Sequence, residues 1–280
     1  MTSTKLHSAF IMFALALTCL ATILSAQSAD NNRVTVPLAD PSRPASVRVH
    51  LLNGSITVKA YEGKDVIVEA RTRGGSSREE SRAPAGMKRI PMSSTGLNIE
   101  SENNQVRIGT DVMQHPVDLT ISVPTRSSLS LKTVNDGNIV VTGVDGELDI
   151  DNINGNVTLN RVSGSVVAHA LNGKILATLV RADAKPMAFS SMNGDIDVTF
   201  PPDLKATLTM RTDNGEVFSD FDVQLQPSAP QQVEDTRKEG GKYRVRVDKT
   251  TRGTVNGGGP EIQFKDFNGS IYIRKAGARQ

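Results

Sequence analysis

Two pairs of aspartates have a spacing that would suit acid–base chemistry. Asp149 and Asp151 flank Ile150, and Asp195 and Asp197 repeat the same spacing. Because side chains alternate along a β-strand, each pair would point outward, about 7 Å apart. Two carboxylates at that scale suit hydrolysis of a glycosidic bond. A strand with one solvated face shows the same polar alternation, and no lysine or arginine cluster stands beside either pair. The sequence therefore predicts no catalytic residues and leaves a glycan-acting enzyme as an alternative.

Oxygen-bearing side chains in the same region suggest calcium as a second option. Calcium-binding nonapeptide repeats read Gly-Gly-x-Gly-x-Asp-x-apolar-x, and glycines recur here at nine-residue intervals. The segment Asn135–Gly143 lacks the paired glycines and the aspartate that follows them. Carboxylate and amide oxygens gathered at one corner would still suit Ca²⁺. The candidates are Asp145, Asp149, Asp151 and Asn154. We predict no metal site and keep a calcium-stiffened adhesive rod as an alternative.

The remaining reactive side chains do not form a recognisable site. His50, His115 and His169 have no metal-ligand spacing, and the single cysteine, Cys19, lies in the apolar N-terminal run. His169 follows an apolar position, so its side chain should point outward. The glycine-rich segment 253–259 precedes a strand and lacks the helix N-terminus that phosphate binding uses. We therefore predict no catalytic, cofactor-binding or metal-binding residues.

Composition excludes several classes of partner. The formal net charge is +2, tryptophan is absent, and only three tyrosines and eight phenylalanines occur. Such a charge gives no bulk attraction to nucleic acid, and so few rings make a base- or sugar-stacking platform difficult to build. The expected partner is an unknown envelope protein or glycan, and not nucleic acid.

The N-terminus has the layout of a secretory signal peptide. Lys5 precedes an apolar run from Ala9 to Leu24, and small residues follow it. We assign residues 1–26 as a signal peptide, with an uncleaved anchor as the alternative. No later stretch has membrane length, so no integral span is expected after signal removal. Export of a chain without further cysteine favours a bacterial envelope, in the periplasm or outside the cell.

A nine-residue repeat defines the centre of the chain. Its apolar residues recur two, four and seven positions after each glycine, as in Ile139, Val141 and Val144 after the first. Short identical units cannot bury an apolar face alone, so they must stack on one another. The glycines of the repeat are Gly137, Gly146, Gly155, Gly164 and Gly173.

Later Asn-Gly corners indicate the size of one coil. Asn172, Asn193 and Asn214 each precede a glycine and lie 21 residues apart. We predict an all-β fold, a single-stranded parallel β-helix (β-solenoid) of about 18–21 residues per coil, with two strand segments each. A β-sandwich is the alternative, because hairpins accept similar turn spacing. In a solenoid these three asparagines would stack into a side-chain amide ladder.

The rest of the chain divides around this repeat. The stretch from Gly253 to Ile273 repeats the corner-then-strand unit, and we expect it to form the last coil. Two polar segments, 74–96 and 226–241, cannot bury a face and are expected to be mobile loops. The predicted parts are a signal peptide (1–26), a proline-rich arm (27–45), a solenoid (46–275) and a C-terminal tail (276–280).

Several of these units carry a family resemblance. They are the strand end Ile121-Ser-Val-Pro124, the corner Thr212-Asp-Asn-Gly215, and the closing Asn256-Gly-Gly-Gly-Pro260 followed by Phe267-Asn-Gly-Ser-Ile271. In this order they resemble the bacterial putative-adhesin, β-strand-repeat family of exported envelope proteins. The resemblance implies a parallel β-helix and no catalytic residues. It favours a non-catalytic adhesin-like or scaffold domain that presents rows of outward polar residues.

Overall fold

The computed structural model describes residues 33–73, 96–110, 116–227, 232–235, 243–246 and 249–277. The predicted signal peptide lies outside these residues, as do most of the expected loop 74–96 and parts of the arm, of the loop 226–241 and of the tail. Every regular element in the described residues is a β-strand. No described segment forms a helix long and apolar enough to cross a membrane. The all-β prediction is confirmed.

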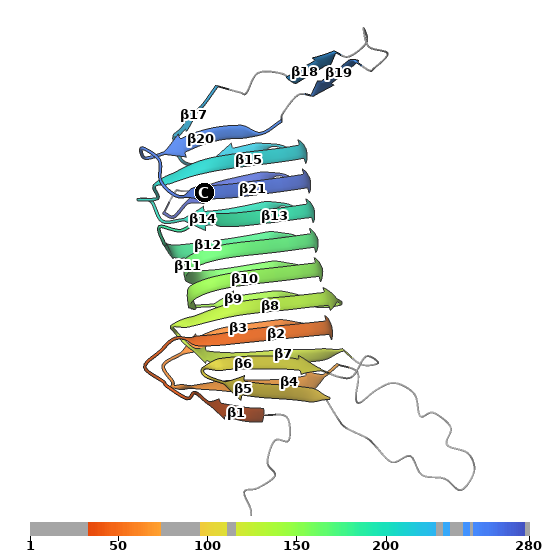
Figure 1. Ribbon diagram of the computed structural model, residues 1–280, viewed down its shortest axis with the longest axis vertical. Helices are drawn as coiled ribbons and strands as arrows, with labels where there is room; N and C mark the ends of the chain where they lie inside the picture. Colours follow the sequence, from red (N-terminus) through yellow and green to blue (C-terminus); the bar gives the residue numbers. More distant parts are fainter. Residues whose placement is uncertain are drawn as a thin grey trace, which may run out of the picture.

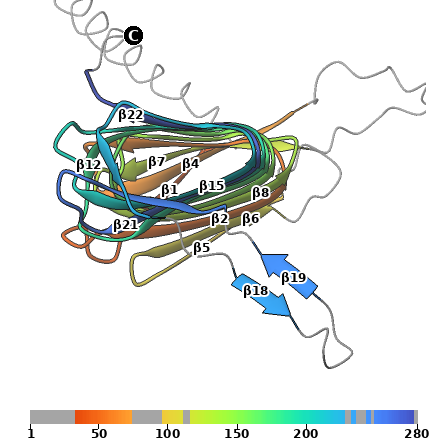
Figure 2. The ribbon, with the colours of Figure 1, turned by 90° about the horizontal axis from the view of Figure 1, so that it is seen from above.

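Twenty strands form one sheet that wraps around a dry core as a flattened tube (Figures 1 and 2). We call its two broad sides the front wall and the back wall. The front wall contains, in spatial order, β5 (Leu97–Glu102), β6 (Gln105–Thr110), β2 (Ala45–Asn53), β8 (Ser127–Asn135), β10 (Asp145–Asn154), the end of β11 (Val157–Asn172), β13 (Met187–Asn193), β21 (Glu261–Asn268), β15 (Ala206–Asn214), β20 (Thr251–Val255) and β17 (Val223–Leu225).

The back wall runs alongside it. It contains, in spatial order, β1 (Arg33–Pro37), β4 (Asp65–Thr72), β7 (Val117–Pro124), β3 (Ile56–Tyr61), β9 (Ile139–Thr142), the start of β11, β12 (Ile175–Ala182), β14 (Ile196–Phe200), β22 (Ile271–Lys275) and β16 (Val217–Ser219). A front strand and the back strand that follows it, such as β13 and β14, form one layer. An asparagine and a glycine usually make the corner between them.

Pairing in the centre of the stack is parallel and in register. Val157 pairs with Ile139 on one side and with Ile175 on the other, each 18 residues away. Ile175 pairs in turn with Ile196, 21 residues further on. Equivalent aliphatic side chains therefore lie directly above one another, and each buries the apolar surface of its neighbours.

The glycine repeat predicts the core correctly at two of its three apolar positions. The residues two and four positions after each central glycine are buried, as Leu148 and Ile150 are. The position seven residues on is buried only at Val144 and Val162. At Ile153 and Leu171 that prediction is wrong, because the strand continues unbroken and alternation turns these side chains outward.

The spatial order of the layers departs from the chain order. The strands β21 and β22 pair with β13 and β14 on one side and with β15 and β16 on the other. The expectation that this segment forms the last coil is therefore wrong, since it is inserted between two earlier layers. At the other end, β6 and β7 lie beyond β2 and β3 (Figure 1).

Both ends of the stack close with antiparallel strands. Strands β4 and β5 pair antiparallel with β7 and β6, and β20 pairs antiparallel with β15. Such short terminal strands limit the open edge that another chain could extend. A separate two-stranded sheet pairs β18 (Gln232–Asp235) with β19 (Tyr243–Arg246) in antiparallel orientation, so part of the expected loop 226–241 is a strand.

Candidate interaction surface

An apolar column runs up the outer face of the front wall. Its side chains occupy the position just before each corner asparagine, and they align because the residues on both sides of them pair in register. Three members are clearly exposed, with Met192 and Phe267 each 44% accessible. Six adjacent strands at about 4.8 Å spacing make the column about 24 Å long. Its members, in spatial order, are Leu52, Val134, Ile153, Leu171, Met192 and Phe267.

The column has a direct physical cause in the sequence. Front strands bury alternate residues, so the side chain before each corner must face solvent. Solvent-facing positions in such strands are usually polar, yet here they are aliphatic, thioether or aromatic in six consecutive layers. A contiguous strip of exposed and half-buried apolar side chains on a surface is typical of an interaction site. Sequence reasoning missed it, although the recurrent pair of an apolar residue and asparagine, as in Leu52-Asn53 and Phe267-Asn268, was a readable signal.

An asparagine ladder borders the column along the corner of the tube. Each side-chain amide donates to the side-chain oxygen of the next asparagine, so the chain of hydrogen bonds is continuous over six layers. The predicted ladder of Asn172, Asn193 and Asn214 is confirmed with one change, because Asn268 stands between the last two. The donor–acceptor distances are 3.2 Å for Asn154 to Asn135, 2.9 Å for Asn172 to Asn154, 2.8 Å for Asn193 to Asn172, 2.9 Å for Asn268 to Asn193 and 2.9 Å for Asn214 to Asn268.

A row of polar side chains borders the column on its other side. Lys132 Nζ donates to Asp151 at 2.7 Å, and His169 Nδ1 lies 2.6 Å from the hydroxyl of Ser190. Two further cations extend the row beyond these pairs. The row therefore carries more positive than negative charge. In spatial order it contains His50, Lys132, Asp151, His169, Ser190, Lys265 and Arg211.

One member of the first aspartate pair is engaged in an ion pair. Asp149 and Asp151 do point outward from β10, as alternation predicts. The carboxylate of Asp151 is bound by Lys132, which raises the pKa of that lysine through their hydrogen bond. Asp149 contacts only the hydroxyl of Ser130, at 3.4 Å. A carboxylate held in an ion pair is a poor proton donor, so Asp151 is poorly suited to the role of the acid in glycoside hydrolysis.

The second pair is more strongly engaged. Asp195 accepts the backbone amide of Ser270 at 3.1 Å and pairs with Lys174 at 3.1 Å, and these contacts lower its pKa. Asp197 accepts Nε of Arg274 at 2.8 and 3.0 Å. The sequence shows no cations beside either pair, but the fold brings Lys132, Lys174 and Arg274 to them. Both carboxylates therefore serve in ion pairs between layers.

The calcium candidates do not converge. Asp145 and Asn154 begin and end β10, so about 30 Å of strand separates them. Asp145 pairs with Arg181 at 2.6 Å, and Asn154 belongs to the ladder. The expectation that these oxygens would meet at one corner is wrong, because one corner contains only one end of a strand. In the part of the chain that the structure describes, no three His, Cys, Asp or Glu side chains are gathered as a metal site requires.

The histidines lie apart from any such cluster. His50 and His169 are exposed on the front wall, which confirms that His169 points outward. His115 falls outside the described residues.

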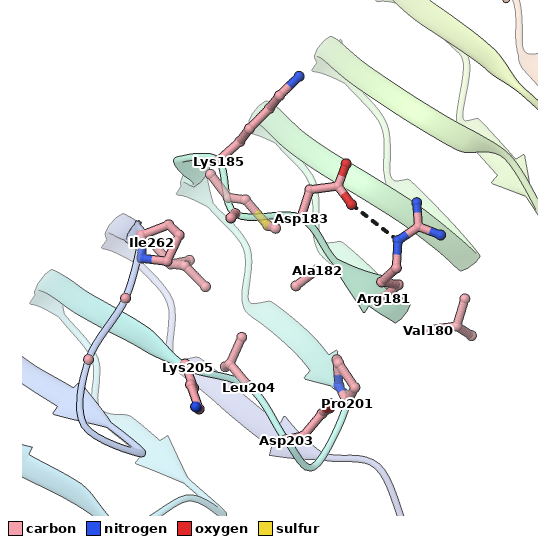
Figure 3. Close-up of a pocket in the computed structure, with 15 residues that line it drawn as sticks. Val180, Arg181, Ala182, Asp183, Lys185, Pro201, Asp203, Leu204, Lys205 and Ile262 are labelled. Atoms are coloured by element: carbon pink, nitrogen blue, oxygen red, sulfur yellow. Dashed lines mark hydrogen bonds and ion pairs between the residues drawn. The ribbon is translucent and has the colours of Figure 1, made fainter.

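A shallow cavity of about 500 Å³ lies at the opposite corner, around Ala182, Leu204 and Pro260 (Figure 3). Two of its cationic side chains already form ion pairs: Arg181 pairs with Asp183 at 3.1 Å, and Lys185 pairs with Glu147 at 2.6 Å. Figure 3 shows Lys185 and Lys205 extending in opposite directions from opposite sides of the cavity. These side chains do not converge on a ligand position.

Comparison with known proteins identifies the family of the chain. The Toastrack DUF4097 family model matches residues 2–256. No curated protein matches the chain. Two crystal structures are similar to it: a "putative cell adhesion protein" from Clostridium sporogenes and a "putative adhesin" from Bacteroides fragilis. Each is 11% identical, with a TM-score of 0.40 over 87% of this chain and 98% or 95% of its own. The sequence match covers most of the chain and confirms the resemblance inferred from its motifs, so the chain belongs to the Toastrack DUF4097 family.

Proposed function

We propose that this protein is an exported, non-catalytic adhesin-like or scaffold domain of the bacterial envelope. In this proposal the stack is a single-stranded parallel β-helix of about 18–21 residues per coil, and it acts as a rigid rod. The rod binds a partner protein through the front wall. The observation that carries the proposal is the apolar column from Leu52 to Phe267, bordered by the asparagine ladder and the polar row.

Two features of the column favour a protein partner. Burying a strip of apolar side chains contributes a favourable free energy that is roughly proportional to the apolar area removed from water. The ladder amides and the polar row beside it can supply the hydrogen bonds and charges that orient a partner. Export is supported by the leader pattern of residues 1–26 and by the absence of cysteine after Cys19.

The column can be tested by polar substitution at its exposed members. The double variant Met192→Ser/Phe267→Ser should lose at least tenfold in binding to the envelope fraction, measured with labelled protein. Because both side chains are 44% accessible, the fold and its melting temperature should change little. The matched control is Leu176→Ser/Val180→Ser, which removes two apolar side chains that are 48% and 51% exposed on β12. Equal binding by both variants would refute the assignment of the front wall.

A second candidate surface lies on the back wall. Phe218 and Tyr272 stack with ring centroids 5.2 Å apart, and Arg274 lies 5.4 Å from the Tyr272 ring. Exposed aromatic faces beside polar groups are a common way to bind a sugar ring. A glycan partner would make Phe218→Ala the variant that loses binding, while Met192→Ser/Phe267→Ser would retain it.

A further inference from the structure

A column of small and polar side chains runs inside the tube, parallel to the asparagine ladder. Its members lie two residues before each corner asparagine, at a position that faces the core. All are buried except Thr212, which is half-buried, and Asp266 is only 1% exposed. The registers place them directly above one another across six layers. In spatial order they are Thr133, Asn152, Ala170, Ser191, Asp266 and Thr212.

Four of the polar members of this column make equivalent hydrogen bonds. Each donates a hydrogen bond to the backbone carbonyl of a corner glycine, and that glycine always belongs to the layer one step nearer to β2. The bonds run from Thr133 Oγ1 to Gly54 at 2.9 Å, from Asn152 Nδ2 to Gly137 at 3.0 Å, from Ser191 Oγ to Gly173 at 3.1 Å and from Thr212 Oγ1 to Gly269 at 2.9 Å.

Asp266 occupies the position where the next such donor belongs. In the same pattern, Asp266 would donate to the backbone carbonyl of Gly194, which is the corner glycine of the adjacent layer. A Cβ built on Gly269 would lie 2.7 Å from Asp266 Oδ2 and 2.9 Å from the Gly194 oxygen, so both oxygens border the same small space. Neither carboxyl oxygen of Asp266 has a hydrogen-bond partner of normal geometry. A carboxylate facing a carbonyl in a buried site would be repelled and would lose its hydration, with only the backbone amides of Phe267 and Asn268 to offset part of the cost.

We propose that in mildly acidic solution Asp266 is a neutral carboxylic acid whose O–H donates to the carbonyl oxygen of Gly194. The proton supplies the hydrogen-bond donor that this position of the column otherwise lacks. The resulting hydrogen bond connects β21 to the layer formed by β13 and β14. The facing residues on the two adjacent front strands, Ser191 and Thr212, are uncharged. The charged side chain that acts on Asp266 is Asp195, whose own carboxylate pairs with Lys174.

The electrostatics of the site agree with this assignment. Burial is the main cause that raises the pKa of Asp266 to about 6; the charge of Asp195 adds to the rise, and the backbone amides of Phe267 and Asn268 oppose it. The folded protein thus binds this proton more tightly than the unfolded chain, whose carboxyl has a pKa of 3.8. The resulting stability is complete below pH 3.8 and is lost as the pH rises through about 6.

This hydrogen bond lies where the spatial order of the layers departs from their order in the sequence. Strands β21 and β22 come late in the sequence but are inserted between two earlier layers. Deprotonation of Asp266 removes a hydrogen bond that holds the inserted layer to β13 and β14. Mildly acidic conditions should therefore tighten the docking of this layer, and neutral conditions should loosen it.

The test compares wild type with Asp266→Asn and Ser191→Ala by urea unfolding at several pH values between 4 and 8. Asn152 shows that an amide at this position donates to a corner carbonyl, so Asp266→Asn should keep the hydrogen bond without the proton. Relative to this variant, the folding equilibrium constant of wild type should fall by up to roughly a hundredfold as the pH rises from 4 to 8. Ser191→Ala removes a non-titrating donor from the adjacent layer and should weaken the fold equally at every pH.

A second measurement detects the proton directly. The infrared difference between wild type and Asp266→Asn at pH 5 should contain the C=O stretch of a protonated carboxylic acid, which should disappear above pH 7. The proposal is overturned if wild type and Asp266→Asn keep a constant ratio of folding constants across this range. It is also overturned if the infrared difference shows an ionised carboxylate at pH 5.

Discussion

Arg274 donates from Nε to both carboxylate oxygens of Asp197, at 2.8 and 3.0 Å, although 77 residues separate them in the chain. The contact joins β22 to β14 and so fastens the inserted layer to an earlier one. The same contact engages the carboxylate of Asp197, one of the two whose spacing suggests acid–base catalysis. The hydrogen bond to Asp197 raises the pKa of Arg274, so its guanidinium remains charged.

We expect no glycosidase activity from the aspartate pairs. Asp195 has a lowered pKa because Ser270 and Lys174 stabilise its charged form, so it cannot act as a general acid near neutral pH. Release of reducing ends from a panel of polysaccharides should be the same for wild type, Asp195→Asn and Asp149→Asn. Asp197→Asn should cost less than about 1 kcal/mol, because the ion pair is partly exposed. Activity that either of the first two variants abolishes would restore the enzyme hypothesis.

The corner glycines should be intolerant of any side chain. A Cβ on Gly173 would lie 2.0 Å from the carbonyl oxygen of Gly155 in the adjacent layer, and this backbone cannot move without separating the layers. Gly173→Ala should therefore cost about 3 kcal/mol or more in the free energy of unfolding, measured with urea. The control is Gly257→Ala, where no atom lies within 4 Å and only the positive φ of 85° is strained. That variant should cost about 1–2 kcal/mol. Similar losses in both would show that packing does not dominate at the corner.

Removing the side-chain amide of a ladder asparagine should lower the free energy of unfolding more than removing the amide of an asparagine outside the ladder. Asn193 donates to Asn172 at 2.8 Å and accepts from Asn268 at 2.9 Å. Asn193→Ala should lower the free energy of unfolding by about 1 kcal/mol, since water can replace part of two exposed hydrogen bonds. Asn98→Ala on β5 is the control, because Asn98 is exposed and makes no side-chain hydrogen bond within the described residues. A larger loss for Asn98→Ala would argue against a stabilising ladder.

Calcium should not stabilise the described part of the fold. The four oxygen-bearing candidates are spread along β10, and Asp145 is already neutralised by Arg181. The melting temperature should thus be the same in excess calcium and in excess chelator. Magnesium serves as the ionic-strength control. A rise specific to calcium would revive the stiffened-rod hypothesis and would place its ligands outside the strand β10.

Local pattern predicts much of this molecule. Alternation and glycine spacing identify the strands and most of the core, including Leu148 and Ile150, because both depend on neighbours within one strand. The same alternation, followed through to Asn154, would have placed Ile153 outside. Corner asparagines are readable because Asn-Gly tolerates the backbone geometry of a tight turn. The outward direction of the aspartates is readable for the same reason as the core.

The amino-acid sequence by itself determined that this chain stacks strands into an all-β structure with repeated corners, because burial of alternate apolar side chains and tight turns are decided over a few residues. Only the tertiary structure decided the order of the layers. Parallel pairing is nearly equivalent for any two layers with the same register, so the pattern cannot say that β21 and β22 enter between β13–β14 and β15–β16. That insertion places Phe267 in the apolar column, Arg274 beside Asp197, and Asp266 beside Gly194, which are contacts between residues more than 70 positions apart.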